Sequence, residues 1–336
     1  MNIGFRLDFT KKSGSGHFFR CLRLAEYFRC KNKKIEIIFY LSHRIKYNLA
    51  KQLNLKNISI KYIKNFNNFV SSVKKEKVQF LVLDQQKINI TKQKIIKKNV
   101  NFFVLIQDLP KKNYCDLLIN QNFYTKKDYK GLIKNFKTKL LIGPNYFIRN
   151  IFINRKINSS RFNINIFFSG STPYKLLNNF LKAITQIKKN KIKINCFVGV
   201  NFEKLNDLKK NYSNKLEIKF FKNQSEKIFL ENLSNSSLAI GSAGVTVFER
   251  LYFRIPSIVV SLAKNQEKNA QFLKEKKAII YLGPSNKVKF DQIKNSLKNI
   301  LFNQTSYLRL KKSTIKIADN LFKFNTCDIL YNHLRS

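Results

Sequence analysis

The chain has 336 residues, 44% of them hydrophobic, and its 65 Lys and Arg against 19 Asp and Glu give a formal net charge of +46. This length suits two domains with separate cores, and this apolar fraction excludes a disordered chain. The five cysteines have no C-x-x-C spacing, which argues against a zinc site or a disulfide framework, and no apolar run approaches the ~20 residues of a membrane helix.

The positive charge first suggests a nucleic-acid partner. The lysines, however, are spread along the whole chain instead of forming a stripe, and they accompany abundant Asn and Ile, as an AT-rich coding sequence produces. We therefore expect solvated lysine faces and no specific nucleic-acid partner, with weak association with an anionic membrane surface or anionic substrates as the alternative. Residues 1–6 indicate a strand and lack the pattern of a signal peptide, so we expect a cytoplasmic protein.

The first half of the chain alternates short apolar strands with helical segments. We predict strands over residues 3–7, 35–40, 80–83, 102–106, 116–119 and 140–142, and helices over residues 17–28 and 45–53. Asp84 ends one of these strands, and Gln107 and Asp108 follow another. The alternation is typical of a parallel sheet with helices on both faces.

A second alternating series begins near Asn163, after a polar, basic segment over residues 150–160. We predict strands over residues 164–168, 192–198, 216–220, 238–240, 257–260 and 278–281, and a helix over residues 175–187. The predicted domains are residues 1–155 and 156–312, and the helical stretch 313–336 is expected to pack on the first domain. The predicted fold class is α/β, with two Rossmann-like domains whose parallel sheets face each other across a cleft.

A glycine-rich loop, Gly14-Ser15-Gly16-His17, connects the first predicted strand to the first helix. Glycines let the backbone approach a ligand, and a helix N-terminus offers N–H groups to it. The loop is not the G-x-G-x-x-G of dinucleotide sites, so the informative residue is His17, placed where open α/β sheets bind ligands. Arg6 and Asp8 are candidates for the same pocket, whereas helix capping or local packing would explain His17 without a function.

A second turn rich in small residues follows the strand 238–240 and opens a helix. Gly244, Val245 and Thr246 form this turn, which suits a diphosphate resting on backbone amides. Glu249, just over a turn into the helix, could accept hydrogen bonds from both hydroxyls of a ribose. A tightly packed turn, with Glu249 in a surface ion pair to Arg250, explains the same residues equally well.

A pair of amides, Asn265 and Gln266, follows the strand 257–260. Amide side chains offer both donors and acceptors, so such a pair at a strand end can bind sugar hydroxyls and acetamido groups. Read alone, the pair also fits an ordinary polar loop.

In this order the three motifs resemble the GT-B nucleotide-sugar enzymes. Specifically, they are similar to the UDP-2,4-diacetamido-2,4,6-trideoxy-β-L-altropyranose hydrolases of pseudaminic acid biosynthesis, which are related in fold to the MurG-type N-acetylglucosaminyltransferases. The similarity runs roughly from Ile3 to Gly283 and includes residues 115–122 and 143–149. The resemblance implies a GT-B fold and a UDP-sugar hydrolase without cofactor or metal. Its product would enter surface glycans such as glycosylated flagellin.

The resemblance also implies roles for individual residues. His17 would be the general base that activates water. The nucleotide-binding residues would be Gly244, Val245, Thr246 and Glu249. The substrate-binding residues would be Asp8, Gly14, Gly16, Arg20, Asn265 and Gln266.

The sequence departs from the family pattern mainly in the sugar-binding half. Asp84-Gln85-Gln86-Lys87 stands where the family often has D-H-Y-G, so a tyrosine near the sugar is replaced by Gln86. The chemistry is nevertheless consistent, because a nucleoside diphosphate leaves without an acid and one histidine suffices as the base. The alternative is a GT-B glycosyltransferase that passes the sugar of a UDP-sugar donor to a sugar or lipid acceptor.

Overall fold

The chain folds into two compact units. The structure, a computed structural model, describes residues 1–7, 16–43, 58–85, 88–149, 162–187, 192–199 and 202–335. The first unit comprises Met1–Asn150 together with Phe322–Ser336, and the second comprises Ile151–Leu321. The sequence predicted the first boundary at residue 155 and the return of the chain at residue 313, whereas in the structure they fall at residues 150 and 322.

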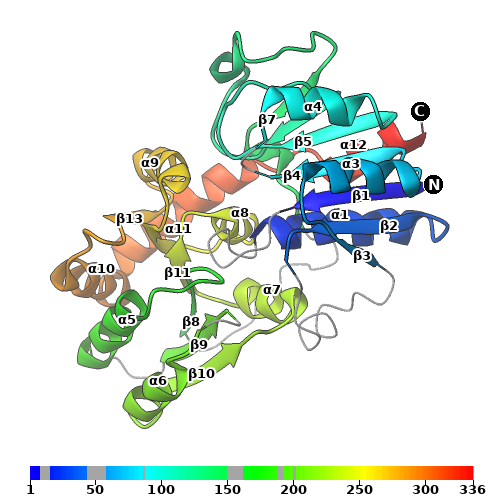
Figure 1. Ribbon diagram of the computed structural model, residues 1–336. Helices are drawn as coiled ribbons and strands as arrows, with labels where there is room; N and C mark the ends of the chain where they lie inside the picture. The colour runs from blue at the N-terminus through cyan, green and yellow to red at the C-terminus, as the bar shows by residue number, and fades with distance from the viewer. Residues whose placement is uncertain are drawn as a thin grey trace. The chain divides into compact units, whose positions relative to one another are not determined.

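Within the described residues, the first unit contains a seven-stranded sheet in the order β3-β2-β1-β4-β5-β6-β7 (Figure 1). All its neighbouring strands are parallel. The bounds are β1 (Asn2–Leu7), β2 (Glu36–Leu41), β3 (Ser59–Tyr62), β4 (Phe80–Asp84), β5 (Phe102–Ile106), β6 (Leu117–Asn120) and β7 (Lys139–Ile142). The central strands are almost wholly apolar because both of their faces are covered.

Helices cover both faces of this first sheet. On one face, α3 (Phe66–Lys75) and α4 (Ile90–Lys97) bury side chains against alternate residues of β4 and β5. On the other face lie α1 (Gly16–Lys31) and α12 (Thr326–Arg335). Phe28 of α1 contacts both Phe80 of β4 and Tyr331 of α12, with ring centroids 6.3 and 6.4 Å away. Two 3-10 helices, η2 (Lys126–Tyr129) and η3 (Pro144–Tyr146), flank β7.

The second unit repeats the architecture. Its described residues contain a six-stranded sheet in the order β10-β9-β8-β11-β12-β13, again parallel throughout. The bounds are β8 (Phe162–Phe167), β9 (Ile192–Val198), β10 (Glu217–Lys222), β11 (Leu238–Ser242), β12 (Ser257–Ser261) and β13 (Ile280–Pro284). The prediction of two Rossmann-like domains with parallel sheets is therefore confirmed.

Eight helical segments of the second unit lie within the described residues. They are α5 (Tyr174–Ile187), α6 (Leu205–Tyr212), α7 (Glu226–Ser234), α8 (Val245–Tyr252), η4 (Lys264–Gln266), α9 (Glu267–Glu275), α10 (Phe290–Phe302) and α11 (Gln304–Asp319). The main core lies on one face of the sheet, where Phe180 of α5 and Leu297 of α10 pack with Ile164 and Ile194. A smaller cluster on α7 and the segment after α8 packs on Ala239.

Two sequence predictions differ in detail from this arrangement. The terminal stretch 313–336 is not one helix, because α11 ends at Asp319 in the second unit and α12 begins at Thr326 in the first. The predicted helix over residues 45–53 lies outside the described residues. Within the described part of the chain, no helix is both long and apolar enough to cross a membrane.

In both sheets the strand order reverses beside the first strand of the unit. β1 has β2 on one side and β4 on the other, and β8 has β9 on one side and β11 on the other. The connections from these strands therefore leave in opposite directions at the carboxyl edge of the sheet. Ligands of open α/β sheets bind at such a point. The order of the strands thus predicts sites after β1 and β4 and after β8 and β11.

The docking of α12 can be tested with Leu330, which is fully buried. Leu330→Ala removes core packing and should destabilise the first unit by about 2–5 kcal/mol. The exposed Asn332→Ala on the same helix is the control and should change stability by less than about 0.5 kcal/mol. Hydrogen exchange of the β1 and β5 amides, measured at increasing urea concentrations, gives the stability of the first unit in each variant. Equal protection in the two variants would contradict stable docking of α12.

Candidate active site

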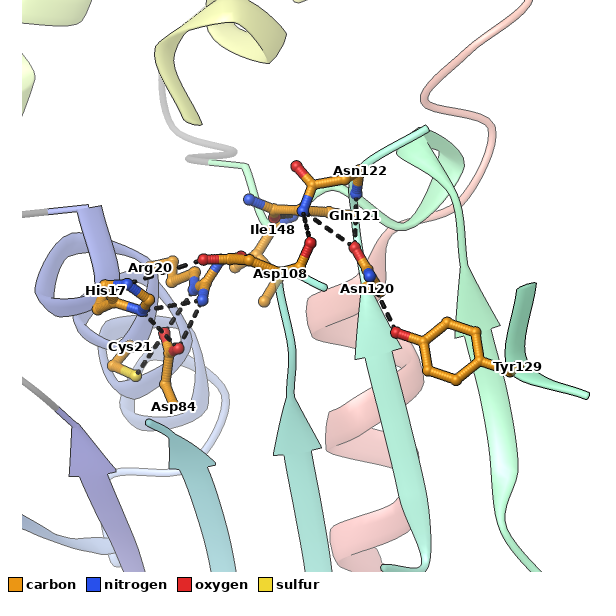
Figure 2. A network of polar contacts seen from close by, with 10 residues as sticks. All are labelled: His17, Arg20, Cys21, Asp84, Asp108, Asn120, Gln121, Asn122, Tyr129 and Ile148. Carbon is orange, nitrogen blue, oxygen red and sulfur yellow. Dashed lines mark hydrogen bonds and ion pairs between the residues drawn. The ribbon is translucent and has the colours of Figure 1, made fainter. Parts of the chain in front are cut away.

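The carboxyl edge of β1 and β4 brings His17 and Asp84 together. β1 and β4 are neighbours with Leu7 opposite Asp84, and α1 begins at Gly16, so the second residue of the helix lies beside the end of β4. His17 is 6% exposed and Asp84 is fully buried. Nδ1 of His17 lies 2.7 Å from Oδ1 of Asp84 (Figure 2). The strand order therefore places a carboxylate directly against the histidine ring.

Arg20, one turn further along α1, contacts the same carboxylate. Its Nε donates to Oδ2 of Asp84, and its Nη2 donates to Oδ1 at 2.5 Å. Nη1 donates to Oδ1 of Asp108 at 2.8 Å, in the segment that follows β5. Arg20 is 1% exposed, so a buried guanidinium joins two carboxylates at the carboxyl ends of the neighbouring strands β4 and β5 (Figure 2). With its donors directed at Asp84 and Asp108, Arg20 is placed to hold these carboxylates.

The imidazole of His17 has a carboxylate on each side. Nε2 lies 3.7 Å from Oδ2 of Asp108, opposite the Asp84 contact. Although Nη2 of Arg20 is also 3.0 Å from Nδ1, a carboxylate at 2.7 Å requires that Nδ1 carry the proton, because two lone pairs would repel each other. Neutral His17 then has its lone pair on Nε2, the arrangement that a carboxylate imposes on a catalytic histidine.

The charges in this cluster shift the pKa of each member. Burial raises the pKa of Asp84, but Arg20 and His17 outweigh it and hold this pKa well below its usual range. Burial and the charge of Arg20 lower the pKa of His17, whereas Asp84 and Asp108 raise it. The two carboxylates have the larger effect, so the pKa of His17 lies above the usual 6.5. Asp84 is therefore an anion at neutral pH, and His17 is a stronger base than an ordinary histidine.

The polar network extends across the ends of β5 and β6 (Figure 2). Asn122 Nδ2 donates to the backbone oxygen of Asp108 at 3.0 Å, and its backbone N–H donates to Oδ1 of Asn120 at 3.0 Å. Asn120 Nδ2 in turn donates to the hydroxyl of Tyr129 at 2.9 Å. The amides of Asn120 and Asn122 thus fix the backbone that carries Asp108. Both belong to the stretch 115–122, which resembles the family but had no predicted role.

Cys21 also lies in the cluster, with Sγ 3.8 Å from Oδ2 of Asp84. Burial, and next the charge of Asp84, raise the pKa of its thiol well above the usual value. A neutral thiol is a poor nucleophile, so Cys21 packs beside Asp84 and takes no part in the chemistry proposed below.

The sequence predicted a role for His17 but none for Asp84 or Asp108. The available signal was an acid at the carboxyl end of a buried apolar strand, which occurs at both positions. Two other predicted site residues, Asp8 and Gly14, lie outside the described residues. Arg6 is directed toward β2, where its guanidinium donates to the backbone oxygen of Tyr40 and to the hydroxyl of Ser42.

The second predicted site lies at the corresponding edge of the second sheet. Gly244 is extended and precedes the first turn of α8, where Val245 and Thr246 are half-buried. A Cβ atom on Gly244 would lie 3.2 Å from Nε2 of Gln266. The amide of Gln266 therefore reaches the Gly244 turn, while its Oε1 accepts a hydrogen bond from the backbone of Leu262 at 2.9 Å. The structure thus brings two separate sequence motifs together.

Glu249 and Arg250 are both buried, with exposed fractions of 5% and 3%. They do not form the surface ion pair that was the alternative explanation of this motif. Arg250 instead donates through Nη2 to the backbone oxygen of Ser242 and through Nη1 to Oγ1 of Thr246 at 3.4 Å. Asn265, in η4, is half-buried.

Comparison with known proteins shows that part of the chain matches a known domain and that two proteins resemble it in sequence. Residues 165–323 match the glycosyltransferase family 28 C-terminal domain. The chain is 27% identical over 287 residues to the UDP-2,4-diacetamido-2,4,6-trideoxy-β-L-altropyranose hydrolase of Campylobacter jejuni, over 82% of this chain and 97% of that protein. It is 28% identical over 274 residues to an uncharacterised protein of Methanocaldococcus jannaschii, covering 77% of this chain but only 55%, about half, of that protein.

Solved structures resemble the whole chain. Acinetobacter baumannii MurG superposes with a TM-score of 0.67 at 14% identity, covering 100% of this chain and 99% of that one. The S. aureus MnaA–UDP co-structure gives a TM-score of 0.64 at 10% identity, covering 99% and 96%. At these identities the likeness establishes the fold, and the chain has the GT-B fold. The resemblance to the hydrolase seen in the sequence is confirmed by the Campylobacter jejuni relative.

The effect of Asp84 on His17 can be measured by NMR titration of the histidine ring. In the wild type we expect a pKa above 6.5, and Asp84→Asn should lower it because the anion that stabilises the imidazolium is removed. The signal is assigned from its absence in His17→Gln. Asp116→Asn, which loses a carboxylate paired with Lys97 just before β6, is the control and should leave the titration unchanged. An unchanged pKa in Asp84→Asn would disprove the pairing.

Proposed function

We propose that this chain hydrolyses a UDP-linked diacetamido-trideoxy sugar to the free sugar and UDP, with His17 as the general base. The observation that carries the proposal is the His17–Asp84 contact of 2.7 Å, which leaves Nε2 as a proton acceptor of raised pKa. The Campylobacter jejuni relative, whose name states this reaction, supports the choice of substrate.

The proposed reaction is a single displacement. His17 Nε2 takes a proton from water, whose oxygen forms a bond to the anomeric carbon while the bond from that carbon to the diphosphate oxygen breaks. The electron pair leaves with UDP, which needs no protonation by an acid because the diphosphate already carries negative charge well. Asp84 stabilises the imidazolium that forms. Attack opposite the leaving group inverts the anomeric configuration.

In the same proposal, the second unit binds the nucleotide. The first N–H groups of α8, from Gly244, Val245 and Thr246, would bind the diphosphate at the positive end of the helix. Glu249 would accept hydrogen bonds from the ribose. Asn265 and Gln266 would bind the sugar, and the contact between Gln266 and Gly244 supports a shared role.

For the first unit we propose that Asp8, Gly14 and Gly16 contact the sugar. Arg20 is reassigned to holding the carboxylates on either side of His17, because its donors are already directed at them. The product would serve a cytoplasmic route to a pseudaminic-type acid for surface glycans. No cofactor is needed for the steps above, since all are proton transfers and one displacement.

The second candidate is a glycosyltransferase that uses a UDP-sugar donor. It is favoured by the match of residues 165–323 to the glycosyltransferase family 28 C-terminal domain. The two functions use the same base and the same leaving group and differ in whether water or an acceptor hydroxyl attacks.

The test is incubation with the UDP-sugar alone. We expect UDP release without any acceptor, and proton NMR of the first product should show the inverted anomer. His17→Asn should lower kcat by about 10²–10⁴-fold, the contribution of a positioned base. UDP affinity should be unchanged, because the proposed nucleotide contacts lie in the second unit. The wild-type rate should fall as pH decreases through the pKa of His17, above 6.5, because only the neutral ring accepts the proton.

The control is His333→Asn, a histidine stacked on Phe102 at 5.1 Å and remote from the proposed chemistry, which should keep the wild-type kcat. UDP release that requires an acceptor would favour the transferase. Retention of the anomeric configuration, or near-normal turnover by His17→Asn, would rule out the single displacement with His17 as the base.

A further inference from the structure

A buried cation that takes no part in the proposed displacement lies beside the Gly244 turn. Arg250 is 3% exposed on α8. Two of its nitrogens donate to the backbone oxygen of Ser242 and to Oγ1 of Thr246, which flank Gly244 on either side. Its Nε has no hydrogen-bond partner among the described residues. The guanidinium is thus directed at the turn with part of its donor capacity unused.

Within the part of the chain that the structure describes, the charge of Arg250 is not balanced by an ion pair. Among the described residues, no carboxylate oxygen lies within 4.0 Å of its guanidinium nitrogens. Burial lowers the pKa of Arg250 to about 10, and the charge of neighbouring Glu249 opposes this only in part. A buried charge without a partner is destabilising, so a protein that retains one needs another source of negative charge.

The space for this guanidinium is provided by a glycine. A Cβ atom on Gly241, at the end of β11, would lie 2.5 Å from Nη1 of Arg250 and would also clash with the backbone oxygen of Phe167 on β8. Glycine at residue 241 therefore leaves room for both the backbone of Phe167 and the guanidinium of Arg250. A neutral side chain could tie α8 to β11 without the cost of a buried charge, so tethering alone does not explain an arginine here.

We propose that Arg250 is a positioning residue for an anion, whose buried charge is balanced when a diphosphate binds the turn 242–246. This rests on the proposed nucleotide-binding role of that turn. Arg250 acts by hydrogen bonding to the oxygens of Ser242 and Thr246. It also acts through its charge, whose attraction for a nearby anion is strong because little water screens it. It makes the turn selective for a diphosphate over an uncharged nucleoside.

The experiment measures binding of UDP, uridine and inorganic pyrophosphate to the full chain by calorimetry. Arg250→Met should weaken UDP and pyrophosphate binding by about 10-fold or more, the loss expected for an interaction with a charged group, and leave uridine affinity unchanged. Arg250→Lys keeps the charge without the fork geometry and should fall between Arg250→Met and the wild type. Arg254→Met is the control, because Arg254 pairs with Asp319 at the surface, and it should bind all three ligands normally.

Each outcome decides between the two proposals. Equal losses for UDP and uridine, or unchanged UDP affinity, would overturn the role of Arg250 and show that it only supports the fold. Pyrophosphate binding that depends on Arg250, without any gain from the uridine group, would keep this role and overturn the UDP-sugar function. Binding of neither UDP nor pyrophosphate to the wild type would overturn both. Should Arg250→Met fail to fold, Arg250→Gln, which removes the charge but keeps a hydrogen-bond donor, provides the same comparison.

Discussion

The carboxylate of Asp84 holds the residues of the candidate active site in the first unit, His17 and Arg20, in place. It is fully buried, and it accepts hydrogen bonds from both His17 and Arg20. Taking an anion out of water costs several kcal/mol unless its partners compensate. The hydrogen bonds from His17 and Arg20 therefore fix the positions of all three side chains relative to one another. Arg20 extends the same constraint to Asp108, and Asn122 fixes the backbone of Asp108 in turn. The position of the histidine ring therefore depends on residues at the carboxyl ends of three different strands, β4, β5 and β6.

The second unit also buries a charged side chain, but one of the opposite sign. In the first unit a buried anion is surrounded by donors, whereas in the second a buried cation, Arg250, lies behind a turn of small residues. Both clusters lie where the strand order reverses, which is a property of the fold. Which charge is buried there is a property of the sequence.

The sequence predicted those features whose signals are local. β1 and α1, whose second residue is His17, follow from apolar periodicity. β3 (Ser59–Tyr62) was not predicted, because its residues are exposed or half-buried and show no apolar run. The role of Asp84 depends on the pairing of β1 with β4, which places Leu7 opposite Asp84. These two strands are far apart in the sequence, so no local sequence pattern predicts that they are neighbours. The break between α11 and α12 was missed because the segment 320–325 contains neither Pro nor Gly, and Phe322 adopts a positive φ of 61° in their place.

Because the chain returns to the first unit at its C-terminal end, that unit is completed only late in synthesis. Residues 322–335 supply α12, whose Tyr331 and His333 rings cover Phe28 and Phe102 of the first unit. A ribosome makes these residues only after the whole of the second unit. Domains fold as units during synthesis at about 5–20 residues per second, so the first unit waits on the order of ten seconds or more with an apolar face uncovered. During that interval the nascent chain offers chaperones a binding surface that the finished protein no longer has.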